Sequence, residues 1–133
     1  MKFRRLKGYK YVLEEEERHE VEIYENVHND FISLDHGSLI IRPGYYWDGA
    51  SGPTIDDKTN HLAALVHDAL YQLMREGLVD RSHRKYIDQL FKQICLDNGM
   101  SRFRAWYYYR AVRMFSKDSS FARKHPRGKV ITI

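Results

Sequence analysis

A change in the spacing of apolar residues divides this chain near its middle. Before residue 48, apolar residues alternate with polar ones over short runs that end at Gly, Pro or Asp, which is typical of β-strands. After residue 57, they recur every three or four positions over longer runs, which is typical of amphipathic helices. A run of strands followed by a run of helices predicts an α+β fold.

The strands are expected to form an antiparallel β-meander. The turn sequence Asp35-His36-Gly37 predicts a hairpin, and Pro43-Gly44 ends its second strand. Residues 130–133 could add a last strand after the helices. The strands of the meander should cover residues 9–13, 20–24, 31–34, 38–42 and 45–47.

About three helices are expected in the second half. The first should cover residues 58–76 and stop at Gly77, and the second should start at Ser82 and stop at Asn98-Gly99. Because only about five residues connect these two helices, they should pack antiparallel. The third should begin near Ser101 and bury one apolar face made of Phe103, Trp106, Tyr107, Ala111 and Met114.

The composition fits a single domain. Of the 133 residues, 43% are hydrophobic and 30% are charged, so the chain can bury a core. We expect one domain, residues 1–133, made of a β-rich part (1–47), a polar loop (48–57), a helical part (58–116) and a basic tail (117–133).

Composition also bears on location and partners. No apolar run is long enough to span a membrane, and residues 1–7 lack the apolar stretch of a secretory signal peptide. The single Cys95 cannot form an intrachain disulfide, so cytosol or a virion is the expected setting. Residues 1–66 hold eight Lys or Arg against twelve Asp or Glu, and residues 67–133 hold fourteen against six. This asymmetry favours docking of the C-terminal half to an acidic surface, or it marks two solvated faces.

The segment Asp48-Gly49-Ala50-Ser51-Gly52-Pro53 is the first candidate for chemistry. Two glycines and a proline around an acid and a hydroxyl predict a tight, non-repeating backbone. Such a loop can direct several carbonyl or N–H groups at an ion or an oxyanion. The alternative is a structural turn whose Asp48 caps the next element.

A second candidate lies inside the first expected helix. His67 and Tyr71 are four residues apart and share one helix face, while Asp68 points to an adjacent side. All three lie in an otherwise apolar sequence, where polar groups need partners. They are either functional residues or a structurally satisfied His and a salt-bridged Asp.

Asp88, in the second expected helix, is the third candidate. If the two helices are antiparallel, Asp88 lies level with His67 and can orient its imidazole, as in a His–Asp dyad. We therefore predict a hydrogen bond between His67 and Asp88. The alternative is an ion pair with Arg84, one turn earlier in the same helix.

These motifs resemble a small family of unknown function that is encoded by phages and prophages. The hallmarks of that family are D-G-A-S, H-D-x-x-Y, A-D-x-x-F and A-V-R. The resemblance covers residues 9–115 and departs from the family at Ile87, where the family usually has Ala. It implies a phage or prophage origin and other phage proteins as partners, in the host cytoplasm or the virion. The matching runs here are WDGASGP, AALVHDALY, RKYIDQLF and YYYRAVRMF.

A more distant likeness suggests an activity. The order of the Gly-Pro loop, H-D-x-x-Y and D-x-x-F is similar to phospholipases A2, especially the disulfide-free kind of parvovirus capsids. The resemblance implies that His67 is the general base, that Asp88 orients it, and that Asp68 binds calcium together with loop carbonyls near Gly49 and Ser51. The substrate would then be a lipid or another ester. The chain departs from this pattern in carrying Asp48 and Ser51 where the phospholipases rely on glycine backbone.

Three functional hypotheses follow. The first is a calcium-assisted ester hydrolase, and the second is a non-catalytic tail, baseplate or assembly protein whose polar cluster is structural. The third is nucleic-acid binding by the third helix, which is the least favoured because no nucleic-acid-binding motif is present. In this helix, basic residues are interleaved with aromatic ones: Arg102, Arg104, Arg110 and Arg113 with Trp106, Tyr107, Tyr108 and Tyr109.

Overall fold

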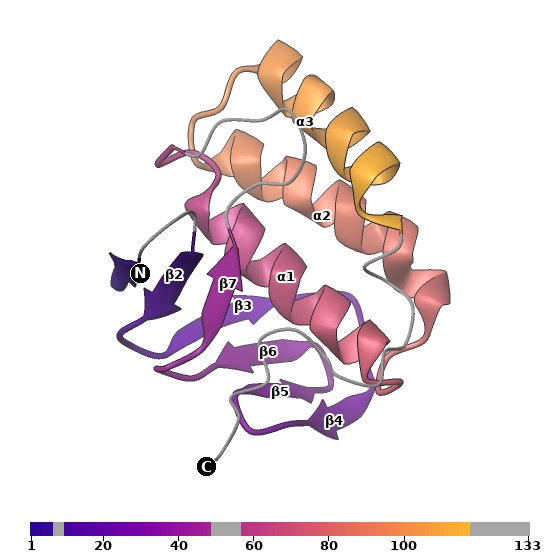
Figure 1. Ribbon diagram of the computed structural model, residues 1–133. Helices are drawn as coiled ribbons and strands as arrows, with labels where there is room; N and C mark the ends of the chain where they lie inside the picture. The colour runs from indigo at the N-terminus through magenta and orange to yellow at the C-terminus, as the bar shows by residue number, and fades with distance from the viewer. Residues whose placement is uncertain (7–9, 49–56, 118–133) are drawn as a thin grey trace.

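Strands precede helices throughout the computed structural model, which describes residues 1–6, 10–48 and 57–117 (Figure 1). The expected α+β class is therefore confirmed. The possible strand at residues 130–133 lies outside the described residues. The strands are β1 Phe3–Arg5, β2 Lys10–Leu13, β3 Glu17–Glu20, β4 Asn26–His28, β5 Ile32–Asp35, β6 Ser38–Ile41 and β7 Tyr46–Asp48. The helices are α1 His61–Arg75, α2 Arg84–Asp97 and α3 Arg102–Phe115, with a short 3-10 helix, η1 Arg81–His83, before α2.

The strands form two antiparallel sheets. One has the order β1-β2-β7 and the other has the order β3-β6-β5-β4. β4, β5 and β6 are consecutive in both the chain and the sheet and form a three-stranded meander, and β1 and β2 form a consecutive pair, whereas β3 and β7 pair with strands distant in the chain. β1 and β4 were not predicted, and β3 lies at residues 17–20 instead of 20–24. These short strands are rich in polar residues and depend on backbone bonds to a neighbouring strand, which local alternation does not reveal.

The predicted hairpin joins β5 to β6. Its two turn residues, His36 and Gly37, have φ angles of 48° and 94°. Positive φ at both positions matches the right-handed twist of the paired strands. In the same turn, the Gly37 carbonyl accepts a hydrogen bond from the Val21 amide, which ties the hairpin to the segment after β3.

We expect Gly37→Ala to destabilise the fold more than Gly77→Ala. Both glycines have positive φ, but a Cβ at position 37 would lie 2.9 Å from the Val21 carbonyl oxygen, whereas a Cβ at 77 would meet nothing within 4 Å. The loss for Gly37→Ala should be at the upper end of about 1–3 kcal/mol, and that for Gly77→Ala at the lower end. Urea unfolding of the two variants measures the difference, and equal losses would contradict the prediction.

The helix ends follow the predicted stop signals. After α1, the Leu78 amide donates to the Leu73 carbonyl and Gly77 has φ 74°, which is a glycine-terminated helix end. Ser101 caps α3 by accepting a hydrogen bond from the Arg104 amide. The predicted N-cap at Ser82 is wrong, because Asp80 accepts the Ser82 amide and starts η1 before α2 begins.

α1 is the central element of the fold. Twelve of its fifteen residues are buried, and it lies between the strands on one side and α2 on the other, with α3 packed on α2 (Figure 1). This position explains why its sequence is apolar on nearly all sides.

The predicted inner face of α3 is largely wrong. Phe103, Trp106, Tyr107 and Met114 are 75, 50, 40 and 67% exposed. Of the predicted set only Ala111 is buried. The side of α3 that is buried against the rest of the protein consists of Ala105, Tyr108, Ala111 and Val112. The helix carries apolar residues on two opposite sides, and periodicity alone does not distinguish which one packs.

Candidate functional site

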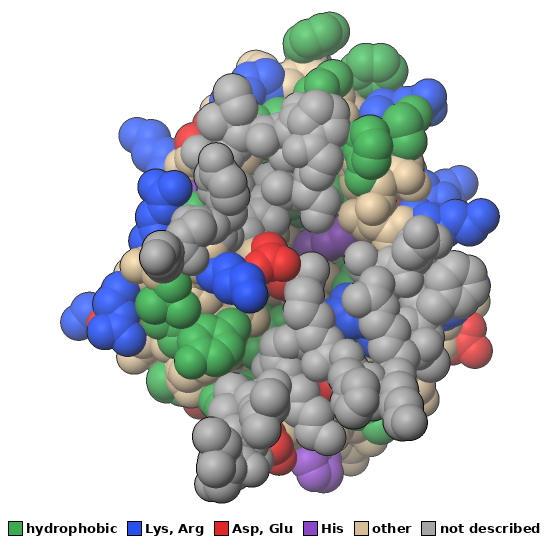
Figure 2. Space-filling model, viewed as in Figure 1, with side chains coloured by type: hydrophobic (Ala, Val, Ile, Leu, Met, Phe, Trp, Pro, Cys, Tyr) green, Lys and Arg blue, Asp and Glu red, His purple; other side chains and the backbone are tan. Residues whose placement is uncertain are grey.

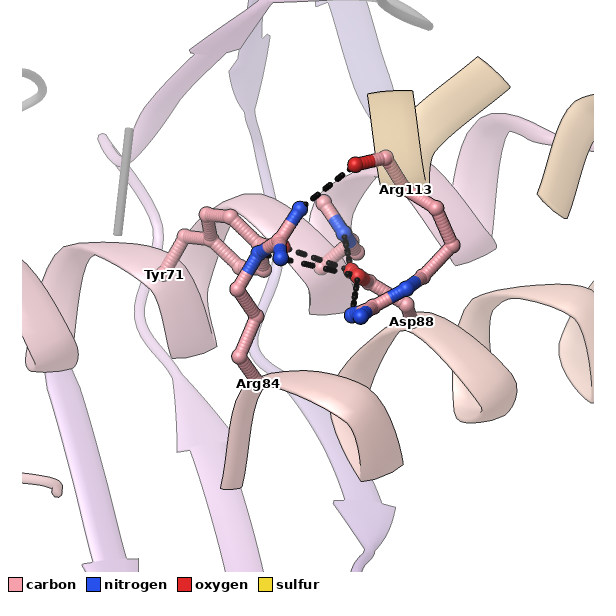
Figure 3. A network of polar contacts seen from close by, with 5 residues as sticks. Tyr71, Arg84, Asp88 and Arg113 are labelled. Atoms are coloured by element: carbon pink, nitrogen blue, oxygen red, sulfur yellow. Dashed lines mark hydrogen bonds and ion pairs between the residues drawn. The ribbon is translucent and has the colours of Figure 1, made fainter. Parts of the chain in front are cut away.

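A fully buried carboxylate, Asp88 of α2, is the centre of the polar site. It has no exposed surface, and side chains from all three helices converge on it (Figure 3). Its Oδ1 accepts hydrogen bonds from His67 Nε2 and from the Tyr71 hydroxyl, both at 2.7 Å. Its Oδ2 accepts one from an Arg113 guanidinium nitrogen at 2.8 Å. A buried charge requires this degree of pairing.

Antiparallel packing of α1 and α2 brings these residues together. His67 contacts Asp88, while Tyr71, one turn later in α1, accepts a 3.1 Å hydrogen bond from Arg84 Nε, one turn earlier in α2. The predicted contact between His67 and Asp88 is confirmed. Arg84, the alternative partner of Asp88, also lies nearby, with its Nε 3.9 Å from Asp88 Oδ2.

Arg84 and Arg113 connect α2 to α3. A second guanidinium nitrogen of Arg84 donates to the Arg113 carbonyl at 2.7 Å, and the Arg113 side chain returns to Asp88 (Figure 3). The role of Arg113 was missed in the sequence, although it is the arginine of the A-V-R hallmark. That motif was the available signal, because nothing else marked this arginine among those of α3.

The network keeps Asp88 ionised. Burial alone would raise the pKa of Asp88, but the interactions with His67, Tyr71 and Arg113 outweigh burial and lower it. Burial and the neighbouring carboxylate raise the pKa of Tyr71, so its hydroxyl stays protonated and donates. Because an ionised carboxylate has no proton to give, His67 Nε2 must carry the shared hydrogen. In a neutral imidazole, Nδ1 is then the proton acceptor.

His67 is held rigidly and is also near the surface. Its ring stacks on Tyr71 at a centroid distance of 4.1 Å and meets the edge of Phe91 at 5.4 Å. The His67 side chain is 9% exposed, compared with 0% for Asp88. The site thus combines a fully buried carboxylate with an imidazole that is buried except for a small exposed part.

Asp48 and Asp68 meet beside this pair. The Asp48 amide, at the end of β7, donates to Asp68 Oδ2 at 3.2 Å, and Asp68 is partly exposed. The Asp48 end of the loop segment therefore contacts the helix that carries His67. Gly49 and Ser51, the other predicted ion ligands, lie outside the described residues.

The described residues contain neither a preformed metal-binding cluster nor an ionised thiol. Among them, no group of three or more His, Cys, Asp or Glu residues is arranged to hold a metal ion. Cys95 is buried, and burial raises its pKa to about 12, so its thiol is not ionised at neutral pH. Among the same residues, no helix has the length and apolar character needed to cross a membrane.

Fold and site together define an α+β protein whose three helices converge on one buried aspartate. The chain belongs to the family described as Protein of unknown function (DUF1353), whose profile matches residues 26–112. That range includes His67, Asp68 and Asp88, begins later than the resemblance at residues 9–115, and stops one residue before Arg113. No curated protein and no solved structure matches the chain.

Proposed function

We propose that this protein hydrolyses carboxylic esters, with phospholipids as the leading substrate class, by chemistry similar to that of phospholipases A2. The observation that supports the proposal is the 2.7 Å contact between His67 Nε2 and Asp88 Oδ1, in which the carboxylate is fully buried and the His67 side chain keeps 9% of its surface exposed. A pair in this arrangement can remove a proton from water near neutral pH.

The proposed reaction has two steps. As a water oxygen attacks the ester carbonyl carbon, His67 Nδ1 takes a proton from that water and a tetrahedral intermediate forms. The imidazolium then returns the proton to the alcohol oxygen as the C–O bond breaks, which releases a carboxylic acid and an alcohol. Asp88 is the positioning residue, since it fixes the tautomer of His67 and stabilises its positive charge.

Calcium remains a proposed cofactor. The described residues supply one carboxylate toward such an ion, Asp68, and calcium needs about six to eight oxygen ligands. In the proposal, the backbone near Gly49 and the Ser51 region complete the site. The bound ion would supply positive charge for an ester oxyanion.

We expect calcium to raise the melting temperature of the wild-type protein if this site exists. An ion that binds only the folded state at a hundredfold excess over its Kd adds about 2.7 kcal/mol of stability, which corresponds to several degrees for a domain of this size. Asp68→Asn should keep the fold and lose the increment. Melting curves that coincide with calcium and with a chelator would argue against any calcium site.

The activity itself is tested by incubating the protein with a soluble short-chain ester and with phospholipid vesicles. Released acid is measured with calcium and, separately, with a chelator. Hydrolysis of either substrate supports the proposal, and the calcium dependence of the rate assigns the cofactor. The proposal would be contradicted if neither substrate released acid, with calcium or with the chelator.

A second candidate is a non-catalytic phage or virion component, such as a tail, baseplate or assembly protein, acting with other phage proteins. Arg84 and Arg113 favour it, because they neutralise Asp88 and join α2 to α3 without any need for catalysis. On this reading, the network only rigidifies the three helices. It predicts large losses of stability in Asp88 variants and no hydrolysis by the wild type.

A further inference from the structure

One side of α3 is apolar and faces solvent. Five residues form this side. Because successive residues of a helix are about 100° apart, these five positions fall within roughly 100° around the helix axis. We call this set the outer face of α3: Phe103, Trp106, Tyr107, Arg110 and Met114, all of them exposed. Figure 2 shows hydrophobic side chains projecting at the α3 end of the molecule, with Lys and Arg side chains beside them. Soluble proteins rarely leave a contiguous apolar patch without an interaction partner.

The charged residues of α3 itself are all positive. Arg110 lies within the outer face, Arg102 borders it, and both are exposed. No Asp or Glu occurs between Asn98 and Lys117. The other two arginines of α3 have carboxylate partners in the fold, since Arg104 pairs with Asp57 and Arg113 pairs with Asp88. The outer face therefore complements an anionic surface.

The residue types match a lipid interface. Trp and Tyr concentrate where membranes meet water, and surface-bound helices combine Trp, Phe or Leu with Lys or Arg. The outer face lies along a single helix of 14 residues, whereas a stable protein interface uses about 20–30 residues on each side. Insertion of side chains into a bilayer surface needs no complementary protein surface and suits such a narrow face.

We infer that the outer face of α3 docks the protein onto anionic phospholipid bilayers. Phe103, Trp106 and Met114 would insert at the headgroup boundary, and Arg102 and Arg110 would pair with lipid phosphates. The inference deepens the proposed function and rests on it for the identity of the substrate. Arg113, on the same helix, reaches Asp88, so docking would hold the His67 site close to the lipid.

Vesicle flotation tests the docking separately from catalysis. We expect the wild-type protein to float with phosphatidylglycerol–phosphatidylcholine vesicles and to bind pure phosphatidylcholine more weakly. The double variant Phe103→Ser/Met114→Ser should bind about tenfold more weakly or worse, because burying either side chain contributes about that factor. Arg110→Glu should lower binding to the anionic vesicles only. Tyr24→Ser, which alters a 65% exposed side chain away from α3, is the matched control and should bind like the wild type.

Fluorescence identifies the inserted residue. Trp47 is 2% exposed and Trp106 is 50% exposed, so a blue shift on adding vesicles reports on Trp106 and should vanish in Trp106→Phe. His67→Gln should still bind vesicles, and Phe103→Ser/Met114→Ser should still hydrolyse a soluble ester if the wild type does. Docking would be overturned by equal flotation of the wild type and the double variant. It would also be overturned by a dimer in light scattering that the double variant abolishes.

Discussion

Replacing Asp88 by alanine is expected to lower the free energy of unfolding by about 3–5 kcal/mol, the usual loss when one partner of a buried ion pair is removed. Asp88 is fully buried and accepts hydrogen bonds from His67, Tyr71 and Arg113. Without it, the buried donors of His67 and Tyr71 would lose their acceptor, and Arg113, whose side chain is 32% exposed, would lose its carboxylate partner. Urea unfolding at neutral pH measures the loss.

Asp97→Ala is the matched control, since Asp97 ends the same helix and is exposed, with one hydrogen bond from Gln93. Its loss should stay below about 1 kcal/mol. If Asp88→Ala does not fold, Asp88→Asn keeps the volume and one acceptor, and should lose less while remaining measurable. A loss for Asp88→Ala no larger than that for Asp97→Ala would contradict the network.

The stabilisation that Asp88 provides should be lost in acid. The pKa of Asp88 is lowered on folding, so the carboxylate stabilises the fold above the ordinary Asp pKa of about 3.9. The contribution disappears as the pH falls through the lowered pKa of the folded state. The difference between wild type and Asp88→Asn should therefore be present at neutral pH and shrink in acid.

His67→Gln should reduce ester hydrolysis by about 10²–10⁴-fold, the usual range for loss of a general base. Its effect on the free energy of unfolding should be smaller than that of Asp88→Ala, at about 1–3 kcal/mol, because one hydrogen bond to the carboxylate is lost. The rate is measured on the soluble short-chain ester. Circular dichroism establishes that the variant is folded under assay conditions.

Tyr71→Phe separates a catalytic from a structural role for His67. The Tyr71 hydroxyl donates to the same Asp88 oxygen at the same 2.7 Å distance, so this variant also removes one hydrogen bond to the carboxylate, together with the one that Tyr71 accepts from Arg84. It leaves the proposed base in place, and the rate should fall by less than about tenfold. Equal losses of rate in both variants would mean that the network acts only by holding the structure.

A double-mutant cycle on His67 and Asp88 tests their coupling. Coupling in stability with no measurable hydrolysis would support the structural role, and loss of rate in variants that remain folded would support the dyad. Additive effects on both quantities would contradict the interaction that joins the two side chains at 2.7 Å.

Several features were predictable from local sequence because their causes are local. The Asp35-His36-Gly37 turn needs residues that tolerate positive φ, and the glycines at 77 and 99 end helices for the same reason. The contact between His67 and Asp88 was predictable as well, since a short connection and a fixed rise per residue put them level.

Other features depend on parts of the chain that meet only after folding. The placement of β3 depends on its backbone pairing with β6, and the separation into two sheets depends on β7 returning to β2. Arg113 joins the site only because α3 packs on α2 with its Ala105 and Val112 side inward. Both sides of α3 are apolar in sequence, and a side becomes core only when another element covers it. The packing of α3 therefore sets both the third partner of Asp88 and the exposed outer face.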